Sequence, residues 1–246
     1  MEADEYARLA QQESWLWWFE LLHRNLFASL DALGLHKPSL KCADFGCGTG
    51  GFAAKLQKHF PSWSVVGLDR SITAVAFARQ KYGTGFVVGD AQRPPFKSNL
   101  FDIVFAIDVM YSRHVEPGRM LQAIFAVLKP GGIVILNNPA YEWLRSYHDT
   151  FVHTGRRYTT TRVATELNQA GFAIVRCTYW NTVLFPIMVL KRKLLTGPAS
   201  HSDVAAIPSW LNQLFFRASL PETAAMRYGV NLPFGGSVLA IGRKGL

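Results

Sequence analysis

The sequence has little cysteine, few charged residues and no apolar run long enough to cross a bilayer. Its three cysteines, Cys42, Cys47 and Cys177, have neither disulfide-framework density nor a CxxC pair, so we expect a reducing compartment, the cytoplasm, and no metal site. The most apolar stretch, residues 183–190, is far shorter than the roughly 20 residues of a transmembrane helix. The polar, acidic start of the chain has the pattern of neither a signal peptide nor a transit peptide.

The composition is that of a folded protein. Apolar residues make up 49% of the 246 residues and charged residues only 17%, which is enough to bury a sizeable core in one large domain. The net charge of +9 would suit an acidic substrate, an anionic membrane surface or nucleic acid. A basic balance of this size is also common without any such partner.

Hydrophobic periodicity predicts an α/β fold. A helix with one broad apolar face, carrying Trp15 and Trp18, precedes residue 41; Trp17 lies off that face. Apolar strands then alternate with helical patterns, which predicts a mostly parallel sheet covered by helices on both faces. The strands are expected at 41–45, 64–69, 85–90, 101–108, 131–138, 172–179 and 237–243, and the helices at 52–60, 71–82, 119–128, 161–170 and 184–195.

We expect the chain to form a single domain with three parts. Residues 1–36 form an N-terminal helical cap, residues 37–138 a cofactor-binding core, and residues 139–246 a substrate-side insert followed by the C-terminal strands. The insert includes "YHDTFVHTGRRYTT", residues 147–160, which interrupts the strand–helix alternation after the fifth strand. Residues 197–208 are predicted to be a polar loop.

A glycine-rich loop, "ADFGCGTGGF", follows the first strand and opens the first helix of the core. Gly46, Gly48 and Gly51 have the spacing GxGxxG, which suits either a dinucleotide pyrophosphate or the methionine part of S-adenosylmethionine. Asp69, at the end of the second strand, could hold ribose hydroxyls in either case. It also argues against a cofactor with a 2′-phosphate, although the neighbouring Arg70 is the residue type that accommodates one.

Acidic residues at three successive strand ends favour one of these cofactors. Asp44, Asp69 and Asp90 end the first three strands, where open α/β sheets bind their ligands, and Asp90 could accept a hydrogen bond from an adenine amino group. Carboxylates suit a positively charged sulfonium better than a pyrophosphate. The alternative is that Asp44 and Asp69 cap the helices that follow them.

With these motifs, the chain resembles the class I S-adenosylmethionine-dependent methyltransferases of the methyltransferase 11 type. The resemblance rests on "DFGCGTG", "GLDRS", "GDAQRPPF", "FDIVFAIDVMY" and "VLKPGG", in this order, between about residues 41 and 137. The flanking stretches resemble one bacterial subgroup of that family. The resemblance implies a Rossmann-like seven-stranded sheet with an antiparallel last strand. The residues that it implies for S-adenosylmethionine binding are Asp44, Gly46, Cys47, Gly48, Asp69, Arg70, Asp90, Ala91 and Ile107.

Methyl transfer to oxygen or nitrogen requires a base near the methyl group. Tyr111, His148 and His153 are the predicted catalytic residues, because they come from the loop after the fourth strand and from the insert. His114 and Asp149 are further candidates. Each has a plainer interpretation: Tyr111 could pack on the cofactor, and a loop histidine could be exposed to solvent.

Four residues are predicted to bind the acceptor. Arg156 and Arg157 could hold a carboxylate or phosphate through their guanidinium forks, with Tyr158 beside them, or they could pair with acidic residues of the insert. Two cations just before a helix are mildly unfavourable, which suggests a use for them. Trp17, off the apolar face of its helix, is the fourth predicted contact.

The segment from 184 to 195 joins an apolar surface to Lys191, Arg192 and Lys193. Contact with an anionic membrane, a homodimer interface and a wall of the substrate pocket are the three interpretations, and membrane contact is the least favoured.

The leading hypothesis is methylation of a small-molecule acceptor, such as an anionic compound or a secondary metabolite, at oxygen or nitrogen, with carbon less favoured. The alternatives are a nicotinamide-dependent oxidoreductase, nucleic-acid or protein methylation, and a non-catalytic cofactor-binding regulator. No Asn-Pro-Pro-Tyr motif follows the fourth strand, which disfavours base methylation, and we expect no nucleic-acid partner.

Overall fold

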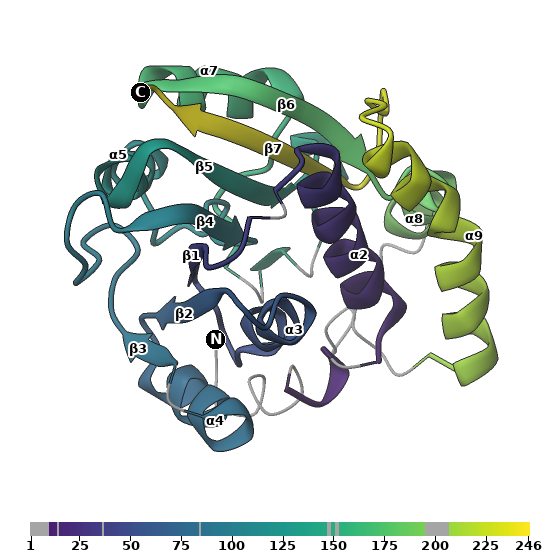
Figure 1. The fold of residues 1–246 in the computed structure, drawn as a ribbon. Helices are drawn as coiled ribbons and strands as arrows, with labels where there is room; N and C mark the ends of the chain where they lie inside the picture. The colour runs from purple at the N-terminus through teal and green to yellow at the C-terminus, as the bar shows by residue number, and fades with distance from the viewer. Residues whose placement is uncertain are drawn as a thin grey trace.

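The computed structural model describes residues 10–13, 15–35, 37–83, 85–146, 149–150, 153–194 and 207–246. A seven-stranded sheet in the order β3-β2-β1-β4-β5-β7-β6 forms its centre (Figure 1). Only β7 runs antiparallel to its neighbours, and this confirms the Rossmann-like α/β fold with an antiparallel last strand. The strands are β1 (Lys41–Phe45), β2 (Ser64–Asp69), β3 (Phe86–Val88), β4 (Phe101–Ile107), β5 (Leu128–Pro139), β6 (Phe172–Trp180) and β7 (Ser237–Lys244).

Helices cover both faces of this sheet, as the alternating pattern predicts (Figure 1). α2, α3 and α4 lie on one face and α5 and α7 on the other, while α9 packs against α2. The helices are α2 (Trp17–Ala32), α3 (Gly51–His59), α4 (Ile72–Tyr82), α5 (Pro117–Val127), α7 (Thr160–Gln169), α8 (Phe185–Leu194) and α9 (Ser209–Arg227), with a 3₁₀ turn η1 (Glu142–Leu144).

The strands are apolar throughout because both of their faces are buried. In β4, Ile103 and Phe105 pack in the cluster under α2 and α3, whereas Val104 and Ala106 pack in the cluster under α5 and α7. Successive side chains of a strand point to opposite faces, so one continuous apolar run supplies both cores.

Local signals fix where two of the predicted helices begin. The Ser71 hydroxyl accepts a hydrogen bond from the amide of Ala74 at 3.2 Å, and Thr159 does the same for Arg162 at 3.2 Å. Such N-caps satisfy amides that have no partner within the helix.

The N-terminal helix differs from its prediction in one respect. Trp18 packs against the buried Trp180, with ring centroids 5.6 Å apart, but Trp15 precedes the helix and is 44% exposed. Trp15 therefore does not share the apolar face that its spacing predicts, because the helix begins only at Trp17.

The helix α9 was not expected from the sequence. It carries Pro221 in its interior, which normally marks the end of a helix. Its buried Glu222 accepts hydrogen bonds from the amides of Asn181 at 2.5 Å and Val183 at 2.9 Å, so α9 fixes the turn between β6 and α8.

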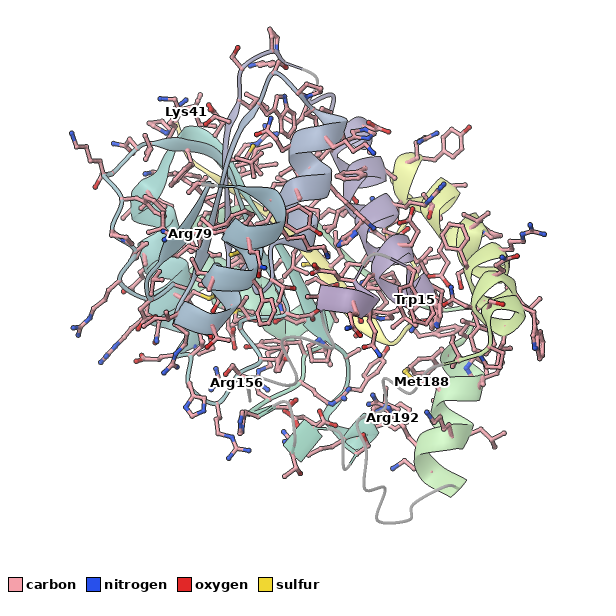
Figure 2. All side chains as sticks on the ribbon, turned by 90° about the horizontal axis from the view of Figure 1, so that it is seen from below. Trp15, Lys41, Arg79, Arg156, Met188 and Arg192 are labelled. Atoms are coloured by element: carbon pink, nitrogen blue, oxygen red, sulfur yellow. The ribbon has the colours of Figure 1, made fainter. Side chains whose placement is uncertain are left out.

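The insert after β5 lies at the carboxyl edge of the parallel strands. Figure 2 shows Lys41, at the amino end of β1, and Arg156, in the insert, at opposite ends of the molecule. Any ligand at the strand ends therefore lies between the sheet and the insert. Among the described residues, no helix is long and apolar enough to span a membrane.

Candidate active site

A cavity of about 1180 Å³ opens at the carboxyl edge of the sheet. Sites for one small molecule typically occupy roughly 300–1,000 Å³, so this cavity has room for two ligands side by side. All nine residues that the sequence assigns to the cofactor line it, namely Asp44, Gly46, Cys47, Gly48, Asp69, Arg70, Asp90, Ala91 and Ile107.

The glycine loop is closed by contacts that leave no space for side chains. Gly46 has a φ of 74°, and a Cβ atom there would overlap Val109, which follows β4. At Gly51, a Cβ atom would lie 2.5 Å from the carboxylate of Glu13. The loop backbone can therefore approach both neighbours, and a ligand, only because these positions are glycine.

Asp69 holds the loop in shape. Its Oδ2 accepts a hydrogen bond from the amide of Gly48 at 2.9 Å, and its Oδ1 accepts one from the amide of Ser71 at 2.8 Å. Each carboxylate oxygen keeps a further lone pair, so both remain able to accept a ligand hydroxyl.

Asp44 is a deeply buried acid of the cavity, with only 2% of its surface exposed. Burial, and then the negative charges of Asp69 and Glu13, raise its pKa well above the usual range. Among the described residues, no hydrogen-bond donor reaches its carboxylate. A cationic ligand with N–H donors would remove this cost, so the donor set fits a sulfonium cofactor that carries a free amino group.

Glu13 is a cavity residue that the sequence did not reveal. It is buried, and its Oε2 accepts a hydrogen bond from the hydroxyl of Thr49 at 2.7 Å, while Lys81 Nζ lies 3.2 Å from Oε1. It comes from a short polar stretch before α2 with no motif of its own. The signal in the sequence is the glycine at position 51, which leaves the space that the Glu13 side chain fills.

Asp108, directly after β4, was also not predicted. It lines the cavity, has a φ of 54° and accepts a hydrogen bond on Oδ1 from the Asn137 side chain at 3.1 Å. Burial raises its pKa to about 7, although the bond from Asn137 and the charge of Arg157 oppose this rise. An acid that titrates near neutral pH in a cavity is a candidate for proton transfer.

Comparison with known proteins agrees with this geometry. Residues 42–132 match the family described as "Methyltransferase domain". A trans-aconitate 2-methyltransferase from Deinococcus radiodurans is 33% identical over 140 residues, covering 56% of this chain and 50% of that protein. A sterol 24-C-methyltransferase from Gibberella zeae is 38% identical over 203 residues, covering 80% of this chain and 48% of that protein. The chain thus spans about half the length of these curated relatives.

Solved structures share the fold over nearly the whole chain. A methyltransferase in complex with the Haloferax volcanii Trm112 activator superimposes with a TM-score of 0.63 at 21% identity, covering 99% of this chain and 95% of that one. A Haemonchus contortus phosphoethanolamine N-methyltransferase solved with S-adenosyl-L-methionine has a TM-score of 0.58 at 19% identity, covering 90% of this chain and 52% of that one. The chain belongs to the class I S-adenosylmethionine-dependent methyltransferases. Its cofactor is S-adenosylmethionine.

Some of the predicted acceptor-side residues reach the cavity. Tyr111, His153 and Trp17 line it, as does His114, whose ring centroid lies 5.6 Å from that of His153. His148 lies outside the described residues.

Three other predicted acceptor residues are used differently. Arg156 donates to the carbonyl of Val115 at 2.8 Å, and Tyr158 is fully buried with its hydroxyl 3.3 Å from the carbonyl of Met110. Neither lines the cavity, because both side chains brace the insert against the loop after β4. Neither side chain faces this cavity, and contact of Arg156 and Tyr158 with the acceptor stays a prediction.

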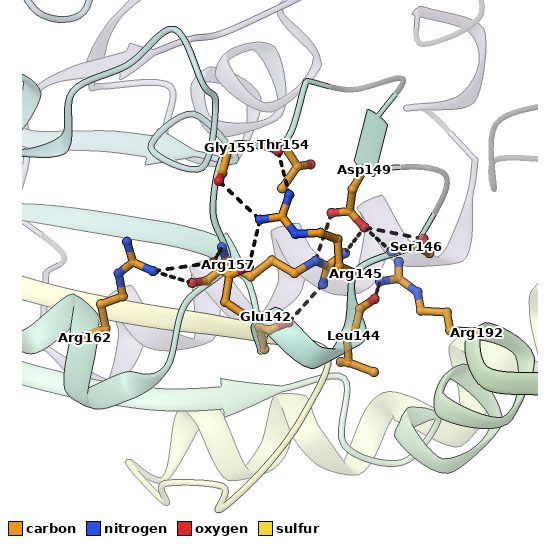
Figure 3. A network of polar contacts seen from close by, with 11 residues as sticks. Glu142, Leu144, Arg145, Ser146, Asp149, Thr154, Gly155, Arg157, Arg162 and Arg192 are labelled. Carbon is orange, nitrogen blue, oxygen red and sulfur yellow. Dashed lines mark hydrogen bonds and ion pairs between the residues drawn. The ribbon is translucent and has the colours of Figure 1, made fainter.

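Arg157 does line the cavity, but its guanidinium is already paired (Figure 3). Its Nε and Nη2 donate to the two oxygens of Asp149 at 2.9 and 3.0 Å, and its Nη1 donates to the carbonyl of Ala140 at 2.9 Å. Burial opposes ionisation of Asp149, but this pairing is the larger combined influence and lowers its pKa. Pairing within the insert, the plainer of the two sequence interpretations, is what the contacts of Arg157 favour.

The helix α8 forms part of the cavity wall. Ile187, Met188, Lys191 and Arg192 line the cavity, and Figure 2 shows Met188 and Arg192 on the side of the molecule where the insert lies. Of the three interpretations of this segment, the pocket wall agrees with the cavity.

Proposed function

We propose that the protein transfers a methyl group from S-adenosylmethionine to an oxygen or nitrogen atom of a small-molecule acceptor. The observation that carries this proposal is Asp44, a buried carboxylate beside Asp69 and Glu13 with no donor to it among the described residues. A cation with a free amino group compensates three carboxylates, whereas the pyrophosphate of a nicotinamide cofactor would add repulsion.

The residues at the strand ends would hold the cofactor in the order in which the strands lie. The glycine loop and Asp44 would receive the methionine part, Asp69 the ribose hydroxyls and Asp90 the adenine amino group, with Ala91 and Ile107 packing beside them. When bound, S-adenosylmethionine supplies an electrophilic methyl group on a positively charged sulfur. The chain contributes alignment of the acceptor and a cavity that excludes water.

The remaining part of the cavity would hold the acceptor. Its wall includes apolar side chains from three helices, namely Trp17, Ile187, Met188 and Phe215. Tyr111 and His153 supply polar groups at the same cavity. We therefore propose an acceptor with an apolar body and a single polar group that is methylated.

Calorimetric titration of the full chain with S-adenosylmethionine, S-adenosylhomocysteine and NAD tests the cofactor. We expect the first two to bind with micromolar dissociation constants and NAD not to bind. An Asp44→Asn variant should lose most of this affinity, while Asp102→Asn, at the amino end of β4 and outside the cavity lining, should keep it. Binding of NAD without S-adenosylhomocysteine would overturn the proposal.

Turnover is then tested by release of S-adenosylhomocysteine with a panel of small amines, phenols, alcohols and carboxylates, and with tRNA and DNA as polymers. The proposal expects turnover with members of the small-molecule panel. Methylation of the polymers alone would favour the nucleic-acid alternative that the net charge of +9 permits.

A further inference from the structure

Asp108 stands at the junction of β4 with the loop that covers the cavity, in a strained backbone conformation. Its φ of 54° is in the left-handed region, which is uncommon for a residue other than glycine although aspartate enters it more readily than most. This turn brings Asp108 into the wall of the cavity next to the predicted cofactor contact Ile107. Strain of this kind gathers at sites where a side chain must be placed for function.

Both the backbone and the side chain of Asp108 are held by one neighbour, Asn137 on β5. The amide of Asp108 donates to the Asn137 carbonyl at 2.9 Å, and the Asn137 side-chain amide donates to Oδ1 at 3.1 Å. Asn137 is fixed in turn by the indole of Trp180, whose Nε1 donates to its Oδ1 at 2.7 Å. Both Asn137 and Trp180 are fully buried, so Oδ1 of Asp108 has a fixed position.

The second carboxylate oxygen of Asp108 has a different environment. Among the described residues, no donor forms a hydrogen bond with Oδ2, although the residue lines the cavity. The charged group that influences Asp108 is Arg157, which comes from the insert and is itself engaged by Asp149. Tyr111, His153 and His114 line the same cavity. Asp108 is thus an oriented carboxylate with one oxygen left for a ligand.

We propose that Asp108 is the proton acceptor of the methyl-transfer reaction, and that the methylated group is therefore an N–H or O–H group such as an ammonium or hydroxyl. This proposal rests on the proposed function. Oδ2 of the ionised Asp108 first takes the proton of an ammonium, which leaves a lone pair on nitrogen, or takes the proton of a hydroxyl as that group attacks. The lone pair of the nitrogen or oxygen forms the bond to the methyl carbon while the carbon–sulfur bond breaks and its electron pair stays on sulfur, and the proton on Asp108 later passes to solvent.

The environment of Asp108 matches this task. Burial raises its pKa to about 7, and the Asn137 hydrogen bond and Arg157 keep it from rising further. A base whose pKa lies near the working pH combines a useful ionised fraction with a useful affinity for the proton. An unshifted carboxylate, with a pKa of about 4, would be a far weaker base toward an ammonium or hydroxyl group.

The first experiment needs neither cofactor nor acceptor. Carboxyl carbons of ¹³C-aspartate-labelled protein are titrated by NMR, and Asp108→Asn identifies the resonance. The isosteric asparagine keeps an oxygen for Asn137. We expect a titration midpoint near pH 7, and a midpoint near pH 4 would overturn the proposal. If Asp108→Asn does not fold, Asn137→Ser identifies the same resonance, because loss of its hydrogen bond raises the midpoint.

The second experiment uses an acceptor found in the panel. Removing a general base typically costs about 10²–10⁴-fold in kcat, so Asp108→Asn should show this loss with an unchanged dissociation constant for S-adenosylhomocysteine. The wild-type rate should rise with pH through about 7. In Asn137→Ser the midpoint should move to higher pH. Asp102→Asn, at the amino end of the strand that precedes Asp108 and paired with Lys129 away from the cavity, is the matched control and should keep the wild-type rate.

Failure of this inference is distinguishable from failure of the proposed function. If Asp108→Asn binds the cofactor and turns over at the wild-type rate, Asp108 is not the base while methyl transfer stands. Turnover with carboxylates alone would also overturn it, since an ionised carboxylate has no proton to lose. If the wild-type chain binds no S-adenosylmethionine, the proposed function itself is wrong.

Discussion

The hydroxyl of Thr49 donates a hydrogen bond to Oε2 of Glu13 at 2.7 Å, and both residues are buried. This contact joins the stretch before α2 to the glycine loop 36 residues later in the chain. Lys81, on α4, holds the other oxygen of Glu13 at 3.2 Å. The N-terminal segment therefore closes one side of the cofactor cavity.

Loss of this contact should weaken cofactor binding more than it weakens the fold. We expect Glu13→Ala to raise the dissociation constant of S-adenosylhomocysteine about tenfold, since one hydrogen bond to a charged group contributes about 1.5–3 kcal/mol and part of this will be replaced by water. Calorimetry measures the affinity. Glu20→Ala is the control, because Glu20 pairs with Lys55 and Arg24 on the outer side of α2. Equal losses in both variants would contradict the role of Glu13.

Binding of S-adenosylmethionine should release a proton from Asp44. Burial together with Asp69 and Glu13 raises the pKa of Asp44, so part of the free protein carries it protonated, and a cationic ligand favours the ionised form. Affinity should therefore increase as the pH rises toward the pKa of Asp44. Calorimetry in buffers of different ionisation enthalpy detects the released proton. Asp44→Asn should bind about 10–100-fold more weakly and release none; an unchanged release would assign the proton to another group.

Removing one partner of the buried Arg157–Asp149 ion pair should lower the stability of the fold. Removing one partner of a buried pair typically costs 3–5 kcal/mol, so we expect Arg157→Ala to lower the free energy of unfolding by about that amount. The double variant Arg157→Met with Asp149→Leu should recover much of it, because no charge is left unpaired. Urea unfolding measures both. A loss in the double variant equal to that in Arg157→Ala would show that the charges themselves contribute.

His23 should make the fold sensitive to acid. It is buried on α2, and burial and then the charge of Lys55 lower its pKa to about 3, although Glu20 opposes this. Its usual pKa is about 6.5, so the unfolded chain takes up a proton that the folded protein does not. Stability is complete above pH 6.5 and falls by up to about 1.4 kcal/mol per pH unit below it. In His23→Leu the free energy of unfolding should fall less between pH 7 and pH 5 than in the wild type, and urea unfolding at the two pH values measures this. Equal falls in the two proteins would contradict the role of His23.

The residues that the sequence assigns to the cofactor all line the cavity because each lies at or just after the carboxyl end of a strand. Gly46, Asp69 and Asp90 lie at the ends of apolar runs, and a parallel sheet brings such ends together. At these strand ends the local sequence pattern and the position in the fold point to the same residues, so the motifs alone identify which residues line the cavity.

The other parts of the cavity depend on contacts that no local sequence pattern records. Glu13 reaches the cavity because Gly51 leaves room for its side chain, and Asp108 reaches it because its backbone turns through a left-handed conformation. Neither residue belongs to a periodic hydrophobic pattern. Arg156 and Arg157 were assigned from the shape and charge of the guanidinium group and from their place before a helix, and none of these shows whether an arginine faces a ligand or a carbonyl. Helix α9 was missed because Pro221 interrupts its pattern and because it packs on α2 instead of the sheet.

The most direct test of the central claim is calorimetric titration of the full chain with S-adenosylmethionine, with NAD and the Asp44→Asn variant as comparisons. The account predicts one site per chain, a micromolar dissociation constant, and proton release that disappears with Asp44. Binding of NAD in preference to S-adenosylmethionine, or equal affinity of wild type and Asp44→Asn, would contradict it.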